Sequence, residues 1–375
     1  MAPRYLRLIL IGVLSIAFLC PAAINAKPSA PTSMWVTGYY PGWQDDLKPQ
    51  DIDYTALTHV IYFTIFPKAD GSLDFQNGVD DATANALARN AHKAGVKVLI
   101  CLGGDGAAHA FRTAIKPDVR DTLVQNMVDW VKAHNFDGVD LDFEPMKQAD
   151  VADFKAFVVH LRGALNRLRP GLQMTAAVEC QGFSDMFGEL QSDFDQINLM
   201  TYDMAGPWSA ETWYNSPLMN RDMVKGVDGE VLPSTDKFVA RWMKDVPASK
   251  LGIGVCCEGR VWRGADAVAK DRSGLPVETV PYSAIMDQYF QTGRYRWDDG
   301  AKASSLIVPG DDETKALVVY DDVRDARVKV AYAKKTGIGG IILWELSEEY
   351  RPGQPAGQRH PLSSAVRAEI GGVKR

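Results

Sequence analysis

Acidic and apolar residues alternate in the segment Gly138–Glu144, which reads Gly-Val-Asp-Leu-Asp-Phe-Glu. Successive side chains of a β-strand point to opposite faces, so Asp140, Asp142 and Glu144 would present their carboxylates on one face. Neighbouring carboxylates would lie about 6 to 7 Å apart. Mutual repulsion and partial desolvation would raise the pKa of at least one of them, which is what a general acid working near neutral pH requires.

The segments that must position these acids alternate between predicted strands and predicted helices. The periodicity of apolar residues predicts helices around residues 119–131, 151–168 and 323–335. Alternating strands and helices favour a (β/α)8 TIM barrel of the α/β class, although a doubly wound open sheet would give a similar pattern. Eight β-rich runs are predicted as the strands: Trp35–Tyr40, His59–Ile65, Val96–Leu102, Gly138–Glu144, Gln173–Val178, Gln196–Tyr202, Gly252–Cys256 and Gly340–Trp344.

In a barrel, the apolar side of the acidic strand would pack under the helices and the acids would line the interior. Three unpaired buried carboxylates have no structural rationale. Glu144 is the candidate proton donor, because it ends the strand and barrel enzymes place their chemistry at that end. A calcium-binding loop would need a glycine and further oxygen donors among these positions. A solvent-facing strand edge could also carry acids on one side, and this alternative stays open here.

One long connection interrupts the alternation. About sixty residues separate the seventh predicted strand from the helix over 323–335, and they include an aromatic cluster and a strand-like run at Leu317–Tyr320. A connection of this length usually has structure of its own. We predict a small insertion over residues 263–322, on the catalytic rim of the barrel.

The N-terminal residues 1–26 have the pattern of a secretory signal peptide. Arg4 and Arg7 precede an apolar stretch that ends near Cys20, and small residues follow as far as Ala26. Leu19 stands where a lipidated cysteine would need a small residue before it, which disfavours a lipoprotein. We expect a secreted mature protein over residues 27–375, extracellular or periplasmic, with no membrane-spanning segment.

Composition excludes several classes of protein. Cleavage after Ala26 would remove two arginines and no acids, so the formal net charge of −6 would become −8. An acidic surface argues against nucleic acid as a partner. No cysteine pair has zinc-ligand spacing with a partner pair, so no metal or other cofactor is predicted. Spacing does not assign disulfides among Cys101, Cys180, Cys256 and Cys257.

The segment Asp137–Glu144 resembles the signature of the family 18 glycoside hydrolases, the chitinases, which runs Asp-Gly-x-Asp-x-Asp-x-Glu. Every fixed position is filled. The resemblance implies a TIM barrel, and it implies that the long connection is similar to the small α+β insertion of many members. Four other stretches follow the family's order: Gly38–Trp43, Gly103–Gly104, Met200–Asp203 and Trp344.

The resemblance also implies catalytic roles in a substrate-assisted mechanism, in which the sugar's own acetamido oxygen attacks the anomeric carbon. Glu144 would protonate the departing oxygen and later activate water. Asp142 would hold the acetamido N–H and offset the positive charge of the oxazolinium ion, while Asp140 would share a proton with Asp142. Tyr202 would hydrogen-bond the acetamido carbonyl, and Asp203 would support the distorted sugar.

Further residues of the matching motifs complete the predicted substrate-binding set. Trp344 would form the floor beneath the sugar at the cleavage point, because sugar rings pack on aromatic planes. Trp43 and Trp208 are candidates for outer subsites, and Met200 and Tyr40 are also assigned to substrate binding.

The chain also departs from the family pattern. Cys101 replaces the usual serine, which could alter the polar support of Asp140, and no site role is assigned to Phe63. Glu179 and Glu258 could extend the polar cleft or could be solvated loop acids.

Three functions fit these residues. The first is a retaining chitinase that cleaves β-1,4 bonds between N-acetylglucosamine units. The second is an endo-β-N-acetylglucosaminidase or a peptidoglycan N-acetylglucosaminidase, because the mechanism requires N-acetylglucosamine only at the cleavage point. The third is a non-catalytic chitin-binding lectin, which the presence of Glu144 disfavours because lectin-like members typically lack that glutamate. The predicted partner is chitin or another N-acetylglucosamine-containing glycan, and the protein is expected to be a monomer.

Overall fold

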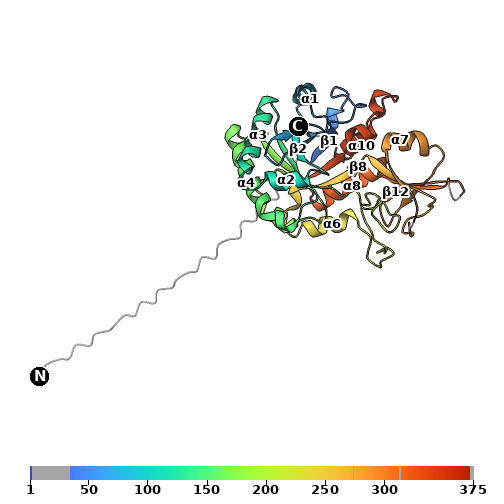
Figure 1. The fold of residues 1–375 in the computed structure, drawn as a ribbon. Helices are drawn as coiled ribbons and strands as arrows, with labels where there is room; N and C mark the ends of the chain where they lie inside the picture. Colours follow the sequence, from blue (N-terminus) through green and yellow to red (C-terminus); the bar gives the residue numbers. More distant parts are fainter. Residues whose placement is uncertain (2–33, 273, 312–313, 372–375) are drawn as a thin grey trace. The chain divides into compact units, whose positions relative to one another are not determined.

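The computed structural model describes Met1 and residues 34–272, 274–311 and 314–371 (Figure 1). The described residues from 34 onward form one compact unit. Apart from Met1, the predicted signal peptide over residues 1–26 lies outside the described residues. Among the helices that are described, none is long and apolar enough to cross a membrane. The described residues also contain no cluster of three or more side chains that could hold a metal ion.

A closed barrel of parallel strands forms the centre of this unit. Its strands follow the order β1-β14-β8-β7-β6-β5-β4-β2, and β2 pairs with β1 to close the ring. A short strand, β3 (Leu73–Asp74), pairs antiparallel with the end of β2. The barrel strands are β1 (Trp35–Pro41), β2 (His59–Pro67), β4 (Lys97–Gly103), β5 (Gly138–Asp142), β6 (Gln173–Val178), β7 (Gln196–Leu199), β8 (Leu251–Cys256) and β14 (Gly340–Trp344).

The structure confirms the predicted barrel, but two strands end earlier than predicted. β5 ends at Asp142 and β7 at Leu199, so Glu144 and Tyr202 lie on the loops that follow. At the end of β5, the Asp142 carbonyl accepts a hydrogen bond of 2.7 Å from the amide of Gly104. Gly103 has a φ of 116°, and a Cβ there would lie 1.8 Å from that carbonyl oxygen. This close approach between β4 and β5 requires glycine at position 103.

Helices cover the outside of the barrel (Figure 1). The three predicted helices are present, as α3, α4 and α8. The capping box of Asp322 and Asp325 begins α8, and Gly337 ends it in the left-handed conformation. The helices are α1 (Asp81–Lys93), α2 (Ala108–Ala114), α3 (Arg120–Ala133), α4 (Val151–Leu168), α5 (Ser184–Leu190), α6 (Thr235–Trp242), α8 (Val323–Thr336), α9 (Leu346–Glu349) and α10 (Pro361–Ile370).

The alternation in β5 divides its side chains as predicted. Val139, Leu141 and Phe143 belong to the large hydrophobic core that includes residues of the surrounding helices. Asp137 precedes this alternation at the opposite end of the strand. Its carboxylate accepts the Val98 amide and lies 2.9 Å from the ring of His92. Asp137 therefore joins β5 to neighbouring elements, away from the acids that follow it.

The long connection after β8 forms the predicted α+β insertion. Its antiparallel sheet has the order β10-β9-β13-β12-β11 and begins at Glu258, before the predicted start at 263. In Figure 1 this sheet (orange) lies beside the barrel on the side of β8 and α8. Its elements are β9 (Glu258–Arg263), β10 (Val277–Pro281), α7 (Tyr282–Ala284), a π-helical turn (Ile285–Tyr289), β11 (Arg294–Asp298), β12 (Ala303–Val308) and β13 (Ala316–Tyr320).

Candidate active site

Asp140 lies at the bottom of the candidate site and is fully buried. The strand register places it between Cys101 of β4 and Thr175 of β6. The Thr175 hydroxyl donates a hydrogen bond of 2.5 Å to one carboxylate oxygen, and the Tyr39 hydroxyl donates one of 3.3 Å to the other. Burial raises the pKa of Asp140 to about 7, although hydrogen bonds from Thr175, Cys101 and Tyr39 oppose this shift.

Asp142 is the next acid on the same face, with 2% of its surface exposed. Burial raises its pKa well above the usual range, and the charges of Glu144 and Asp140 add to this. Its Oδ1 atom is buried and has no hydrogen-bond partner among the described residues. Unsatisfied buried carboxylate oxygens are costly. The free oxygen is thus suited to accept a hydrogen bond from a ligand.

Glu144 lines the open cavity above these two aspartates. Burial, together with the nearby charges of Glu179 and Asp105, raises its pKa to about 7. A carboxyl group with this pKa keeps a proton near neutral pH and can donate it. Glu179, which the sequence left without a role, lines the same cavity.

The raised pKa of Glu144 predicts the pH dependence of catalysis. A general acid must be protonated, so kcat/KM should fall as the pH rises through about 7. Glu179→Gln removes a negative charge that raises this pKa, and the alkaline limb should then move to lower pH. Measuring kcat/KM from about pH 4 to about pH 9 checks both expectations. An alkaline limb at the same pH in both proteins would contradict the role of Glu179.

Tyr202 and Trp344 form the aromatic part of the site. Their rings are stacked, with centroids 6.4 Å apart and planes inclined by 21°. The Tyr202 ring lies over Gly254 of β8, where a Cβ atom would be only 2.6 Å from the ring. Tyr39 and Phe63 also contact Trp344, with centroid distances of 5.6 and 4.9 Å.

The cavity has a volume of about 370 Å³, which is within the range of sites for small ligands. Asp203 lies on its wall and forms an ion pair with Arg260 of β9. Trp208 has 64% of its surface exposed, and the Arg260 guanidinium lies 5.8 Å from its ring centroid. The lining residues are Glu144, Glu179, Cys180, Gln181, Met200, Tyr202, Asp203, Met204, Trp208, Pro233 and Phe238.

The structure places one predicted substrate-binding residue, Tyr40, away from the candidate site. Tyr40 belongs to the core between barrel and helices, and its hydroxyl donates to the Leu47 carbonyl at 2.8 Å. Neighbouring residues of a strand face opposite ways, so Tyr39 faces the interior instead. Trp43 was predicted, like Trp208, for an outer subsite. Its side chain is exposed and contacts Phe63 edge-on, with ring centroids 5.6 Å apart.

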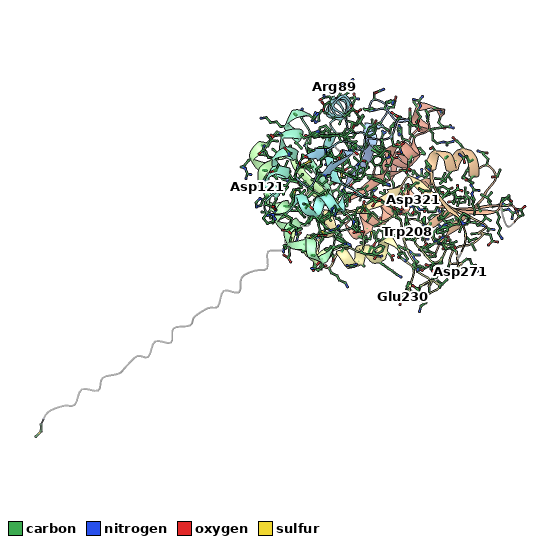
Figure 2. The ribbon with its side chains drawn as sticks, viewed as in Figure 1. Arg89, Asp121, Trp208, Glu230, Asp271 and Asp321 are labelled. Carbon is green, nitrogen blue, oxygen red and sulfur yellow. The ribbon has the colours of Figure 1, made fainter. Side chains whose placement is uncertain are left out.

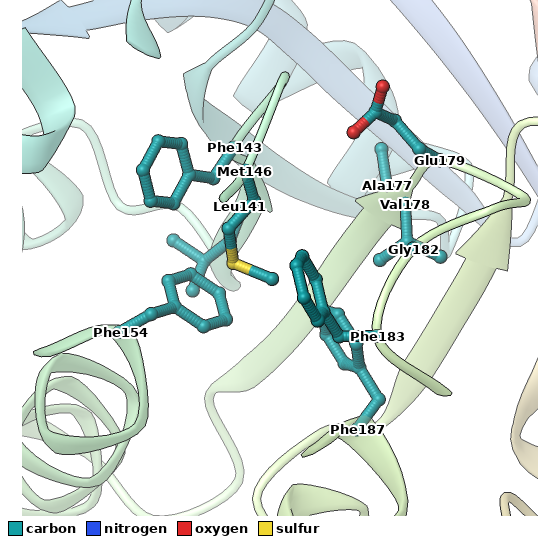
Figure 3. Close-up of a pocket in the computed structure, with 10 residues that line it drawn as sticks. All are labelled: Leu141, Phe143, Met146, Phe154, Ala177, Val178, Glu179, Gly182, Phe183 and Phe187. Atoms are coloured by element: carbon teal, nitrogen blue, oxygen red, sulfur yellow. The ribbon is translucent and has the colours of Figure 1, made fainter. Parts of the chain in front are cut away.

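A separate apolar pocket lies behind the catalytic strand (Figure 3). Leu141 and Phe143 line it together with Phe154 of α4 and Phe187 of α5. In Figure 3 the carboxylate of Glu179 points away from the phenylalanine rings. The pocket therefore belongs to the packing of strands against helices, and among the described residues only Glu179 lines both this pocket and the cavity of Glu144.

A (β/α)8 barrel with an interior line of acids and aromatic rings near them is an arrangement found in glycoside hydrolases. The family model described as "Glycosyl hydrolases family 18" matches residues 35–349. The chain belongs to this family.

Similar proteins include several described as chitinases. A probable endochitinase of Caenorhabditis elegans is 27% identical over 387 residues, which cover 92% of this chain and 62% of that protein. The chain thus spans less than two thirds of that relative. Chitinase B of Serratia marcescens is 26% identical, over 79% of this chain and 74% of its own length.

Two solved structures confirm the fold. The Group IV chitinase of Ostrinia furnacalis in complex with allosamidin has a TM-score of 0.78 at 22% identity, covering 90% of this chain and 99% of that one. Human YKL-39, described as a pseudo-chitinase with retained chitooligosaccharide binding properties, has a TM-score of 0.80 at 20% identity, covering 90% and 100%.

Proposed function

We propose that this protein is a chitinase that hydrolyses β-1,4-linked N-acetylglucosamine polymers with retention of anomeric configuration. The observation that carries the proposal is the arrangement of Asp142 and Glu144. Asp142 has a buried carboxylate oxygen without a hydrogen-bond partner among the described residues. Glu144 lines the cavity, and its pKa is about 7. The first suits the N–H of an acetamido group, and the second suits proton transfer to a glycosidic oxygen.

In the first step, the acetamido carbonyl oxygen of the sugar forms a bond to the anomeric carbon as the glycosidic C–O bond breaks. Glu144 gives its proton to the departing oxygen. The acetamido N–H hydrogen-bonds Asp142, whose negative charge stabilises the oxazolinium ion. Tyr202 donates a hydrogen bond to the acetamido oxygen and orients it for attack. The Tyr202 pKa is raised by burial, so its hydroxyl keeps the required proton.

In the second step, Glu144 is a carboxylate and acts as the base. It takes a proton from water as the water oxygen bonds to the anomeric carbon and the bond to the acetamido oxygen breaks. The sugar is thereby released with its original configuration, and Glu144 is again protonated. Burial raises the pKa of Asp142, so Asp142 becomes negatively charged only when the proton that it shares with Asp140, the preceding acid on the same face of β5, moves to Asp140.

The names of the similar proteins support chitin as the substrate. An endo-β-N-acetylglucosaminidase or a peptidoglycan N-acetylglucosaminidase would use the same machinery on another glycan. A lectin-like role is disfavoured because Glu144 is present. We also propose that residues 1–26 direct export and that the mature enzyme comprises residues 27–375. Determining the N-terminus of the protein isolated from its producing cells would test this.

The substrate is tested by incubating the purified protein with chitin oligomers, N-glycopeptides and peptidoglycan, and following the products by mass spectrometry. Release of N-acetylglucosamine oligomers from the chitin substrates supports a chitinase. Cleavage of N-glycopeptides or peptidoglycan alone would replace chitin by that glycan. Binding of chitin oligomers without any cleavage would identify a lectin.

Trp344→Ala should weaken binding of the substrate, because the sugar would lose the aromatic surface beneath it. Packing of a sugar ring on an aromatic ring is worth about a few kcal/mol at most. We therefore expect KM to rise by about tenfold, the equivalent of about 1.4 kcal/mol. Steady-state kinetics on chitin oligomers measure this change. Tyr295→Ala is the control, because Tyr295 lies on β11 at the edge of the insertion sheet, whereas Trp344 ends barrel strand β14 and contacts Tyr202 and Tyr39. An unchanged KM for Trp344→Ala would remove Trp344 from the site.

A further inference from the structure

Lys329 of α8 is completely buried, although it does not line the catalytic cavity. Its ammonium group forms an ion pair with the carboxylate of Asp321, which follows β13 and is labelled in Figure 2. It also donates a hydrogen bond of 2.5 Å to the hydroxyl of Ser216. A buried ion pair is a weak source of stability, because both charges lose their hydration. The hydrogen bonds made by Ser216 and Asp321, the two partners of Lys329, indicate what other role this lysine has.

Both partners of Lys329 hold backbone at the ends of catalytic strands. The Ser216 hydroxyl donates a hydrogen bond of 2.5 Å to the carbonyl of Thr201. Asp321 accepts the amide of Cys256, the last residue of β8, at 2.9 Å. The Thr201 hydroxyl in turn accepts the Gly254 amide of β8 at 2.8 Å. Lys329 thus links the chain after β7 to the end of β8 from outside the cavity.

The linked segment carries Tyr202, which directly follows Thr201. The Tyr202 ring lies close to Gly254 and stacks on Trp344. The next residue, Asp203, donates its amide to the side chain of Asn215 at 3.2 Å, and Asn215 precedes Ser216 in the chain. The position of the Tyr202 hydroxyl therefore depends on the same short loop that Lys329 contacts.

We propose that Lys329 is a positioning residue for catalysis, which acts through Ser216 and Thr201 to hold Tyr202 in place. The proposal rests on the proposed function, in which Tyr202 orients the acetamido oxygen. A displacement of about 1 Å at such a group can cost about 10²-fold in rate. The loss should appear in kcat, because alignment of the attacking oxygen matters most in the transition state.

Two variants separate positioning from folding. Ser216→Ala removes the hydroxyl that joins Lys329 to Thr201 and leaves the ion pair intact. The double variant Asp321→Asn with Lys329→Met removes both charges together, so neither residue leaves the other as an unpaired buried charge, and the asparagine oxygen can still accept the Cys256 amide. Lys335→Met is the matched control, because Lys335 is an exposed lysine of the same helix.

The full chain is purified for each variant, and kcat and KM on chitin oligomers are measured together with Tm and hydrogen exchange of the amides of residues 200–204. We expect kcat to fall about 10-fold or more in both variants, with KM changed less than about threefold. Exchange over 200–204 should become faster while exchange elsewhere in the barrel is unchanged. Lys335→Met should match the unaltered protein in every measurement.

Wild-type kcat in folded Ser216→Ala protein would overturn the proposal and leave the proposed function intact. Loss of activity that follows a fall in Tm, with faster exchange across the whole barrel, would also overturn it, because the role would then be structural. If the unaltered protein cleaves no glycan, the proposed function fails, and the exchange of residues 200–204 alone decides whether Lys329 positions this segment.

Discussion

Glu144→Gln is expected to lower kcat/KM on chitin oligomers by at least about 10²-fold, because it removes the group that transfers the proton in both steps. Glutamine has nearly the same shape, so binding of the substrate should persist and KM should change little. Steady-state kinetics at the pH optimum of the unaltered protein provide the measurement.

The matched control for this variant is Glu189→Gln, which makes the same chemical change at an exposed position of α5. It should keep full activity. We expect Glu144→Gln to fold normally. Burial raises the pKa of Glu144 and so favours its neutral form, which glutamine resembles. Near wild-type turnover by Glu144→Gln would end its assignment as proton donor.

Asp142→Asn should lower kcat by about 10²-fold. The asparagine side chain is neutral, so it no longer stabilises the positive charge of the oxazolinium ion. The loss should lie mainly in kcat, because that charge develops only as the glycosidic bond breaks. Single-turnover kinetics on a chitin oligomer would separate this chemical step from product release.

Asp185→Asn, at an exposed position of α5, is the control for this second variant and should react at the normal rate. If Asp142→Asn raised KM and left kcat unchanged, Asp142 would bind the ground state and the transition state equally well. The charge stabilisation proposed for it would then be wrong.

The acidic strand could be predicted from the sequence because its chemistry and its strand period coincide. The alternation of Gly138–Glu144 requires two faces, and the structure has Leu141 in the core and Asp142 in the barrel interior. The barrel itself follows from the alternation of strands and helices together with the family motifs. Strand ends were harder to predict, because the alternation of side chains continues to Glu144 although the backbone pairing of β5 ends at Asp142.

Side-chain contacts between residues far apart in the sequence could not be predicted. The sequence offered Tyr39 and Tyr40 as adjacent tyrosines, and only the orientation of β1 decides which of them meets Asp140. Alternation along β6 could have indicated that Thr175 faces inward, but its register with Asp140 sets the contact. The ion pair of Lys329 and Asp321 gave no signal, because charged residues on a helix are usually solvated.

The central claim is that the acetamido oxygen of the substrate, with Glu144 as acid and base, carries out the hydrolysis. The most direct test is NMR of the anomer first formed when the unaltered protein cleaves a chitin oligomer, recorded before mutarotation. The account predicts the β-anomer as the initial product, because two successive displacements at the anomeric carbon retain its configuration. The α-anomer as the initial product would mean a single displacement by water and would contradict the account.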